Sequence, residues 1–441
     1  MKRSLHAWTV CCVLAVAMQA ARVNAQTTAS APTGSANGAL QTMTWEAVKA
    51  RFEAANPSLK ADALNVDEMK AEEITAYLRP NPTLSFTEDQ TYPFAPHIDP
   101  NTNTTNYRPL TDALTTGSIS YLHEREHKRE LRLESAKEGT RIAGSLHEDL
   151  QRNMIYNLRV AFVQTLEARA VLELARADLS YYDNIIAISQ ARFKAGDLAQ
   201  IDLDRIELLR VQYESEIEAA TVNLRSQKIA LLQMLDDRTP VDRFDVTGAF
   251  DFADTLPPLN DCEQSALQAR PDLAAALQSV LQAKTNAKLA RANGSADPTF
   301  AVDSGANPPL PTYVGVNVNL PIRIFDRNQG EKKRTQIDIE RNQELTEAAR
   351  AQVFSDVDSA YEQVRSAVAL LKPYRDKYRA QSTRVRDTVT YSYQHGGASL
   401  MHFLNAQSDY RTVQLAYLQL VGTYMTAAAQ LNLAVGREVI Q

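Results

Sequence analysis

Apolar residues recur at intervals of three and four over two long stretches of the chain, and this spacing is typical of coiled-coil seams. We expect helices over about 124–194 and 198–236, and again over 327–394 and 398–436. A helix of about 70 residues would be a rod of about 100 Å. Any one stripe also fits the core of an ordinary helical bundle, but several on rods this long favour an extended bundle. The stripes are Leu203, Ile206, Tyr213, Ile217, Ala220, Leu224 and Leu231, and Tyr410, Val413, Tyr417, Leu420, Tyr424, Ala427 and Leu431.

A different pattern, strict alternation, marks a short strand region between the helices. From Thr312 to Leu320, valine and leucine alternate with tyrosine, glycine and asparagine, which predicts a strand with one apolar and one polar face. We expect Asp303 to Pro311 to form the turn before it. Weaker strand patterns cover Thr83 to Phe86 and Gly117 to Leu122. We expect a strand pair in each half of the chain, and so four strands in a mainly α-helical chain.

The chain also repeats itself. Asn56-Pro57-Ser58-Leu59 and Arg270-Pro271-Asp272-Leu273 each open a helical stretch that leads to a strand region and then to a long helix with a glycine break. The two breaks, around Gly196 and Gly396, lie 200 residues apart. Such periods indicate duplicated structural units. We expect a first repeat over 45–250 and a second over 251–441.

The first residues have the pattern of a secretory signal: Lys2 and Arg3, an apolar run, and small residues before Gln26. We expect residues 1–25 to be cleaved and 26–44 to be a flexible leader. Cleavage would leave Cys262 as the single cysteine, which excludes an intramolecular disulfide. It would also change the formal charge from -6 to -9, which disfavours nucleic-acid binding.

After the signal, no run of 18 or more apolar residues predicts a transmembrane helix. A bilayer would then be entered by strands. Four strands cannot close a barrel, and open strand edges are not tolerated in lipid, so several copies would be needed. Three copies would supply twelve strands and room for a pore.

Two segments resemble the TolC family of outer-membrane efflux proteins, and the duplicated unit extends that resemblance over most of the chain. One is Tyr393-Gln394-His395-Gly396 running into Phe403-Leu404-Asn405-Ala406-Gln407; the other is Leu320 to Gly330, LPIRIFDRNQG. The form FDRNQG is most similar to the cobalt–zinc–cadmium efflux branch. The resemblance implies a homotrimer, with a long coiled α-helical barrel in the periplasm and a twelve-stranded transmembrane β-barrel in the outer membrane. It also implies a periplasmic adaptor and an inner-membrane pump as partners.

In that family the tip near the glycine breaks closes the tunnel. The resemblance implies a latch between Tyr393 and Asp202, although both could instead face solvent at a helix turn. His402 and Asn405 stand where the family often has acidic residues, which weakens the case for a cation-selective acidic ring. Three copies of His402 would carry charge below about pH 6.5 and repel one another, unless each is simply solvated. The candidate tip residues are thus Gly196, Gly396, Asp202, Tyr393, His402 and Asn405.

One motif suggests an enzyme instead. His123-Glu124-Arg125-Glu126-His127 matches the H-E-x-x-H pattern of zinc proteases, which places two histidines one helical turn apart. Here it begins where strand should become helix, and arginine and lysine neighbours would repel a cation. We expect no catalytic residues, no cofactor and no resident metal.

The function expected from the sequence is an outer-membrane channel that passively conducts small molecules, drugs or metal cations, from pump and adaptor to the outside. A duct for type I protein secretion would have the same fold, because the pump selects the cargo. A periplasmic adaptor or coiled-coil scaffold without membrane strands is a third possibility. The alternation over Thr312 to Leu320 argues against this scaffold.

Overall fold

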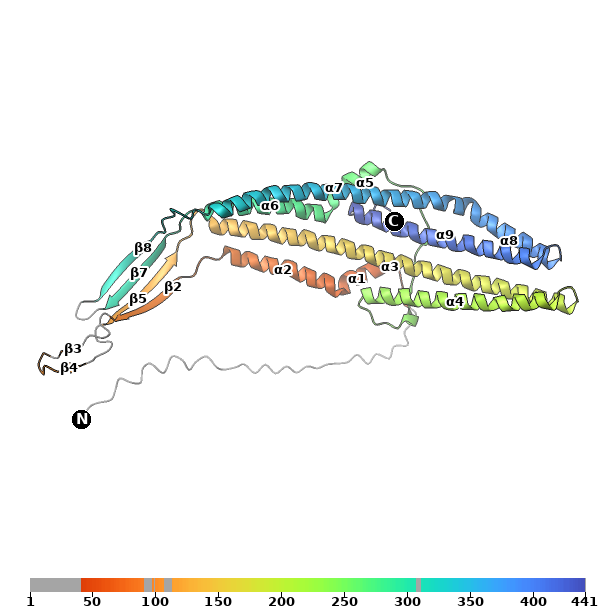
Figure 1. Ribbon diagram of the computed structural model, residues 1–441, viewed down its shortest axis with the longest axis horizontal. Helices are drawn as coiled ribbons and strands as arrows, with labels where there is room; N and C mark the ends of the chain where they lie inside the picture. The colour runs from red at the N-terminus through yellow and green to blue at the C-terminus, as the bar shows by residue number, and fades with distance from the viewer. Residues whose placement is uncertain (1–40, 91–96, 99, 107–112, 307–310, 441) are drawn as a thin grey trace, which may run out of the picture. The chain divides into compact units, whose positions relative to one another are not determined.

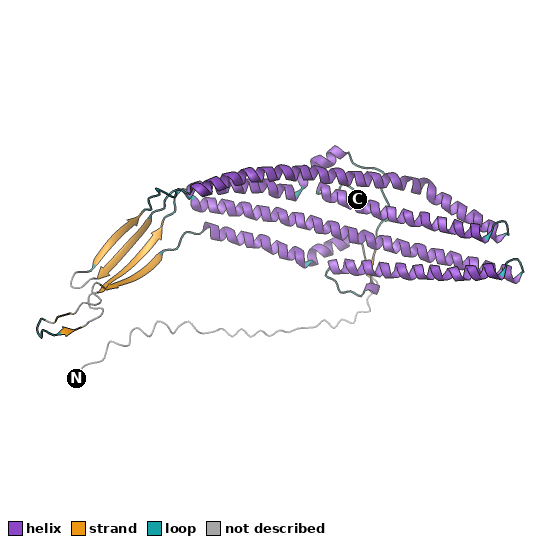
Figure 2. Ribbon diagram, viewed as in Figure 1, coloured by secondary structure: helices purple, strands orange, loops and turns teal. Residues whose placement is uncertain are grey.

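The computed structural model describes residues 41–90, 97–98, 100–106, 113–306 and 311–440, with helices predominating (Figure 2). The helices are α1 (Trp45–Ala55), α2 (Pro57–Tyr77), α3 (Lys128–Lys194), α4 (Gln200–Met234), α5 (Leu259–Ala269), α6 (Pro271–Ala292), α7 (Gln329–Pro373), α8 (Arg379–Gln394) and α9 (Leu400–Val435), with a 3-10 turn η1 (Val241–Arg243) and a π-helical turn η2 (Tyr374–Tyr378). The strands are β1 (Gln41–Met43), β2 (Thr83–Gln90), β3 (His97–Ile98), β4 (Thr105–Asn106), β5 (Ala113–Leu122), β6 (Phe244–Val246), β7 (Thr299–Ala306) and β8 (Tyr313–Asn319). The expected signal peptide and most of the expected leader lie outside the described residues.

Four strands form one antiparallel sheet in the order β2-β5-β7-β8, with the sheet at one end of the helices and the α3–α4 and α8–α9 turns at the other (Figure 1). The predicted strand over Thr312 to Leu320 is confirmed as β8. The turn expected over Asp303 to Pro311 is wrong as far as Ala306, because β7 continues to that residue. Polar Asp303 and Ser304 were mistaken for a turn, whereas each pairs with a residue of β5 and of β8 inside the sheet.

The long helices lie side by side in the order α4, α3, α9 and then α7 with α8 (Figure 1). The shorter helix α2 packs on α3, and α6 packs on both α3 and α7. The buried side chains of the two predicted stripes include Leu203, Ile206, Tyr213, Tyr417 and Tyr424. Helix α7 ends at Pro373, whose ring cannot donate a backbone hydrogen bond, and the π-helical turn η2 follows directly. The sequence pattern did not predict that turn.

Hydrogen bonds at matching positions support the duplication. In the first repeat, the Asn56 Nδ2 donates to the carbonyl of Met234 at the end of α4, 3.2 Å away. In the second, the Arg270 Nη1 donates to the carbonyl of Ala434 at the end of α9, 3.4 Å away. Asn56 and Arg270 each precede the proline that opens a helix, and the two acceptors are 200 residues apart. Each repeat thus ties its short helix to the end of its last long helix.

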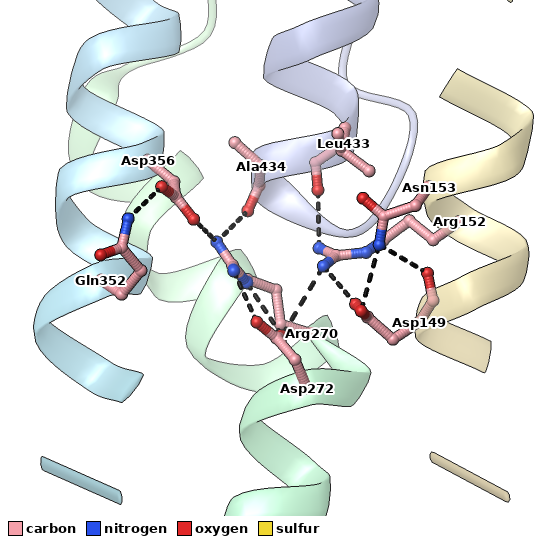
Figure 3. Close-up of polar contacts among 9 residues, drawn as sticks. All are labelled: Asp149, Arg152, Asn153, Arg270, Asp272, Gln352, Asp356, Leu433 and Ala434. Carbon is pink, nitrogen blue, oxygen red and sulfur yellow. Dashed lines mark hydrogen bonds and ion pairs between the residues drawn. The ribbon is translucent and has the colours of Figure 1, made fainter. Parts of the chain in front are cut away.

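The second tie is ionic (Figure 3). The Arg270 guanidinium is buried and donates to Asp272, at 2.6 and 3.0 Å, and to Asp356 of α7 at 2.8 Å. Beside it, Arg152 of α3 donates to the carbonyl of Leu433 at 2.7 Å and lies 3.7 Å from Asp272. This network connects α3, α6, α7 and α9 at one level.

The first three residues after the undescribed segment also differ from expectation. Gln41–Met43, counted in the expected leader, form β1, which pairs in parallel with β6. Thr44 then caps α1 through its hydroxyl, which accepts from the Ala47 amide. None of the helices in the described ranges has a segment apolar and long enough to span a membrane.

Candidate functional site

Both glycine breaks have the same helix-ending geometry. Gly196 has φ of +87° and Gly396 of +77°, the left-handed conformation that only glycine adopts readily. After α3, the Asp197 amide donates to the carbonyl of Arg192 at 2.9 Å, and after α8 the Gly397 amide donates to Ser392 at 2.7 Å. These are Schellman caps, in which a left-handed residue closes the last helical turn. The chain therefore reverses at the same level in both repeats.

An aromatic and aliphatic core joins the two hairpins near these turns. Tyr393 is buried and stacks on Phe403, with ring centroids 5.0 Å apart. Tyr182 stacks on Tyr213 at 4.5 Å, and its hydroxyl donates to the carbonyl of Ile206 at 3.0 Å. Burial raises the pKa of Tyr182, so this hydroxyl remains a donor. The core thus has contributions from α3, α4, α8 and α9.

The hydroxyl of Tyr393 has no partner within the described part of the chain, although the atom is buried. An unpaired buried hydroxyl costs about 1–3 kcal/mol. No hydrogen bond joins it to Asp202 in the described chain, and the side chain of Asp202 is partly exposed in the first turn of α4. His402, 200 residues later, is exposed in the first turn of α9, as is Asn405 one turn further on. Of the candidate residues, the structure places only Tyr393 inside the core.

Arginines that the sequence analysis did not single out join the hairpins. The Arg192 Nη1 donates to the carbonyl of Tyr393 at 2.7 Å, and its guanidinium lies 5.2 Å from that ring. Further from the turns, the Arg411 Nη2 donates to Glu216 of α4 at 2.5 Å. Both arginines break the repeat, because the residues 200 positions away are Ser392 and Val211. This difference between the two repeats could have identified both arginines from the sequence.

A buried carboxylate completes this second group. Asp178 of α3 lies 4.0 Å from the Arg411 Nε. Burial raises the pKa of Asp178 to about 6, despite the opposing charges of Arg411 and Arg386. The Arg386 guanidinium in turn lies 4.6 Å from the ring of Tyr181 and 4.0 Å from that of Tyr410. Four helices are thus held together by one charged and aromatic cluster.

The H-E-x-x-H pattern does not form the geometry that zinc binding needs. His123 follows the end of β5 and His127 is in the left-handed conformation just before α3, so the two are not one helical turn apart. The Glu124 carboxylate is engaged by Arg132, at 2.5 and 2.9 Å. No group of three or more metal-ligating side chains occurs among the described residues.

The chain is similar in sequence to known outer-membrane proteins. Residues 263–437 match the family model described as outer membrane efflux protein. The cobalt-zinc-cadmium resistance protein CzcC of Cupriavidus metallidurans is 21% identical over 90% of both chains. The outer membrane efflux protein BepC of Brucella suis is 22% identical over 65% of this chain, and the match spans 64% of BepC.

Solved structures agree on the fold. A crystal structure of CusC matches with a TM-score of 0.72 at 16% identity, over 91% of this chain and 94% of CusC. The open state of the Neisseria gonorrhoeae MtrE outer membrane channel matches with a TM-score of 0.69 at 17% identity, over 90% and 89%. The duplicated hairpins, the four-stranded sheet and the matched sequence lead to one conclusion: this chain has the fold of these outer-membrane channels, and its residues 263–437 match the outer membrane efflux protein family.

Proposed function

We propose that this protein is the outer-membrane channel of a tripartite efflux system and acts as a homotrimer. It passively conducts small molecules from a periplasmic adaptor and an inner-membrane pump to the outside. The observation that carries this proposal is a two-faced sheet with open edges, attached to long helices that end in a narrow packed tip.

The sheet has one apolar and one polar face. Cross-strand partners on the first face form an exposed row across all four strands, namely Leu84, Ile119, Val302 and Val316. The neighbouring row faces the other way and consists of Ser85, Ser118, Asp303 and Gly315. An apolar outer face and a polar inner face are what a sheet around an aqueous pore in lipid requires.

Both outer strands of this sheet, β2 and β8, have one unpaired edge in the described chain. Lipid provides no hydrogen bonds for such edges. Pairing β2 of one copy with β8 of the next satisfies both, and three copies make a twelve-stranded barrel wide enough to conduct.

A second interface between copies follows the helices. Four exposed apolar residues of α4 lie at multiples of seven positions, with Ser215 at the one remaining position between them: Ile201, Leu208, Val222 and Ile229. Such a stripe is an unfilled coiled-coil seam. On the opposite edge of the helical layer, which is formed by η2 and α8, Tyr378 and Val385 are exposed and lie seven residues apart. Rotation about an axis parallel to the helices brings one edge against the other at equal height.

Charges on the two edges are complementary at that height. Glu218 of α4 is exposed about 18 residues from the start of α4, about 27 Å along the helix. Lys377 lies about 17 residues before the end of α8, about 26 Å along the other edge, and Arg384 lies one heptad closer to the tip. Neither Glu218 nor Arg384 has an ion-pair partner in the described chain. We assign these groups to the contact between neighbouring copies.

The tip is proposed as the closing element, with Gly196 and Gly396 as its turns. Its buried hydroxyl on Tyr393, which has no partner within the described chain, supports the proposed latch to Asp202. The exposed positions of His402 and Asn405 are compatible with either the lumen or the solvent outside it. Single-channel conductance from pH 5 to 8 tests both: Tyr393→Phe should conduct more at every pH, and His402→Ala should lose any acid-dependent change.

Drugs and metal cations are the proposed cargo, since one relative carries the name of a cobalt-zinc-cadmium resistance protein and another that of a pyoverdine export protein. Cargo choice is assigned to the pump, because the tip core of the described chain consists mainly of packed apolar and aromatic side chains.

The test of this function is the native mass of the detergent-extracted protein. We expect a trimer in wild type, a weakened trimer in Glu218→Lys and recovery in Glu218→Lys with Lys377→Glu. Glu173→Lys, a charge reversal at an exposed residue of α3 that pairs with Arg169, is the control and should remain trimeric. A monomeric wild type found free in the periplasm would refute the proposal.

A further inference from the structure

A cavity of about 590 Å³ lies between α1, α3, the end of α9 and the segment that follows α9. Helix α1 and the C-terminal end of the chain lie between the sheet and the tip (Figure 1). Its inner wall is aromatic and aliphatic, with Trp45, Tyr156, Ile155, Leu433 and Ile440. Nothing in the proposed conduction path uses this cavity.

One cation in the cavity is not satisfied. The Arg159 guanidinium lies 4.5 Å from the ring of Trp45, yet it has no hydrogen bond or ion pair within the described chain. Burial lowers the pKa of Arg159, although Glu438 and Glu46 act against this effect. Arg159 is half-buried, and a charge that is partly removed from water without a hydrogen-bonding partner is unfavourable. The five N–H donors of Arg159 are therefore available to a ligand.

Two other polar side chains of the cavity, Arg152 and Asn432, already have partners. Arg152 donates to Leu433 and Asp149, and the Asn432 side chain bonds to the backbone of Val439 and Ile440. Arg159 is thus the group that selects what enters. Two parallel N–H groups of a guanidinium can donate to the two oxygens of one carboxylate.

The rim limits the charge of that ligand. Glu46, Glu148 and Glu438 line the cavity and are exposed, and the cations Lys49 and Arg437 line it as well. The three carboxylates oppose a dianion such as phosphate more than they oppose a single carboxylate. The apolar wall in turn favours a ligand with an apolar body.

We propose that this cavity binds a small molecule with one carboxylate and an apolar body, held by Arg159 against Trp45. The site is independent of the proposed channel function, because none of its residues lies at the sheet or the tip.

The chain contains its own reporter for this site. Of its two tryptophans, Trp8 lies in the expected signal peptide, so Trp45 provides the emission of the processed protein. The experiment is a titration of tryptophan emission in the full detergent-extracted protein with N-acetyl-L-leucine. N-acetyl-L-leucinamide, which lacks the charge, and inorganic phosphate are the comparison probes.

We expect a saturable change with N-acetyl-L-leucine, and at least tenfold weaker binding of both comparison probes. Arg159→Gln should weaken binding at least tenfold. Arg159→Lys keeps the charge but loses the fork, and should lie between. Arg176→Gln, an exposed arginine on the same helix, should bind as wild type does.

Circular dichroism confirms that each variant is folded, and Trp45→Phe confirms the source of the emission. The proposal is overturned if the emission does not saturate, if the amide binds as well as the acid, or if folded Arg159→Gln binds like wild type.

Discussion

Ionisation of the Asp178 carboxylate should lower the contribution of this residue to stability as the pH rises from mild acid to neutral. Its side chain is only 11% exposed, and its pKa is raised from 3.8 to about 6, mainly by burial. Between about pH 4 and 6 the folded state keeps a proton that the unfolded state has lost. Stability therefore falls as pH rises through this window, and the full penalty is present above about pH 6.

Replacement of Asp178 by asparagine removes the penalty. A rise from 3.8 to about 6, at 1.36 kcal/mol per pKa unit, corresponds to at most about 3 kcal/mol per chain at pH 7.5. For about 400 folded residues, the unfolding entropy is about 0.8 kcal/mol/K, so the melting temperature should rise by about 3–4 °C. At pH 4 the variant and wild type should melt together.

Thermal melts followed by circular dichroism in detergent, from pH 4 to 7.5, measure this difference. Asp183→Asn is the control, because Asp183 lies on the same helix but is 44% exposed and pairs with Arg210. Its melting temperature should differ from wild type by less than 1 °C at each pH. The reasoning fails if Asp178→Asn is destabilised at pH 7.5, or if its difference from wild type does not change with pH.

Other perturbations test the tip and the repeat junction. Gly396→Ala should cost about 1 kcal/mol because of its φ of +77°, whereas Gly330→Ala at the start of α7 should be neutral or stabilising; paired melts distinguish the two. Phe403→Ala should destabilise the tip core by about 3–5 kcal/mol and increase conductance, and an unchanged melt would contradict its burial. Arg270→Met should cost about 3 kcal/mol at pH 7, because Asp356 loses its cation and Asp272 keeps only the more distant Arg152. Burial alone would raise the pKa of Asp272, but the hydrogen bonds and charge of Arg270 outweigh burial and lower it. The destabilisation caused by Arg270→Met should therefore shrink below about pH 4, where Asp272 becomes protonated. A destabilisation that does not change with pH would contradict this explanation.

Local patterns were sufficient for the order and type of the main elements. The sequence located α3, α4 and α9 to within a few residues and predicted α7 and α8 as one helix; the three-to-four stripes of α4 and α9 were visible because a helix must bury one face. The glycines at 196 and 396 located both turns because no other residue readily takes that backbone conformation. The alternation of apolar and polar residues located β8, because successive side chains of a strand point to opposite faces of the sheet.

Only the tertiary structure decided which side chains meet. Periodicity defines one face of a helix but not how far that helix is rotated against its neighbours, so Tyr393 entered the core while Asp202 and His402 remained outside it. The same limit concealed the contact of Arg411 with Glu216, whose residues lie 195 positions apart. Polar Asp303 suggested a turn until its partners on two neighbouring strands were known. Sequence by itself determined the elements, because their causes are local; the cavity beside Trp45, the ion pairs and the tip core depend on lateral packing between distant segments.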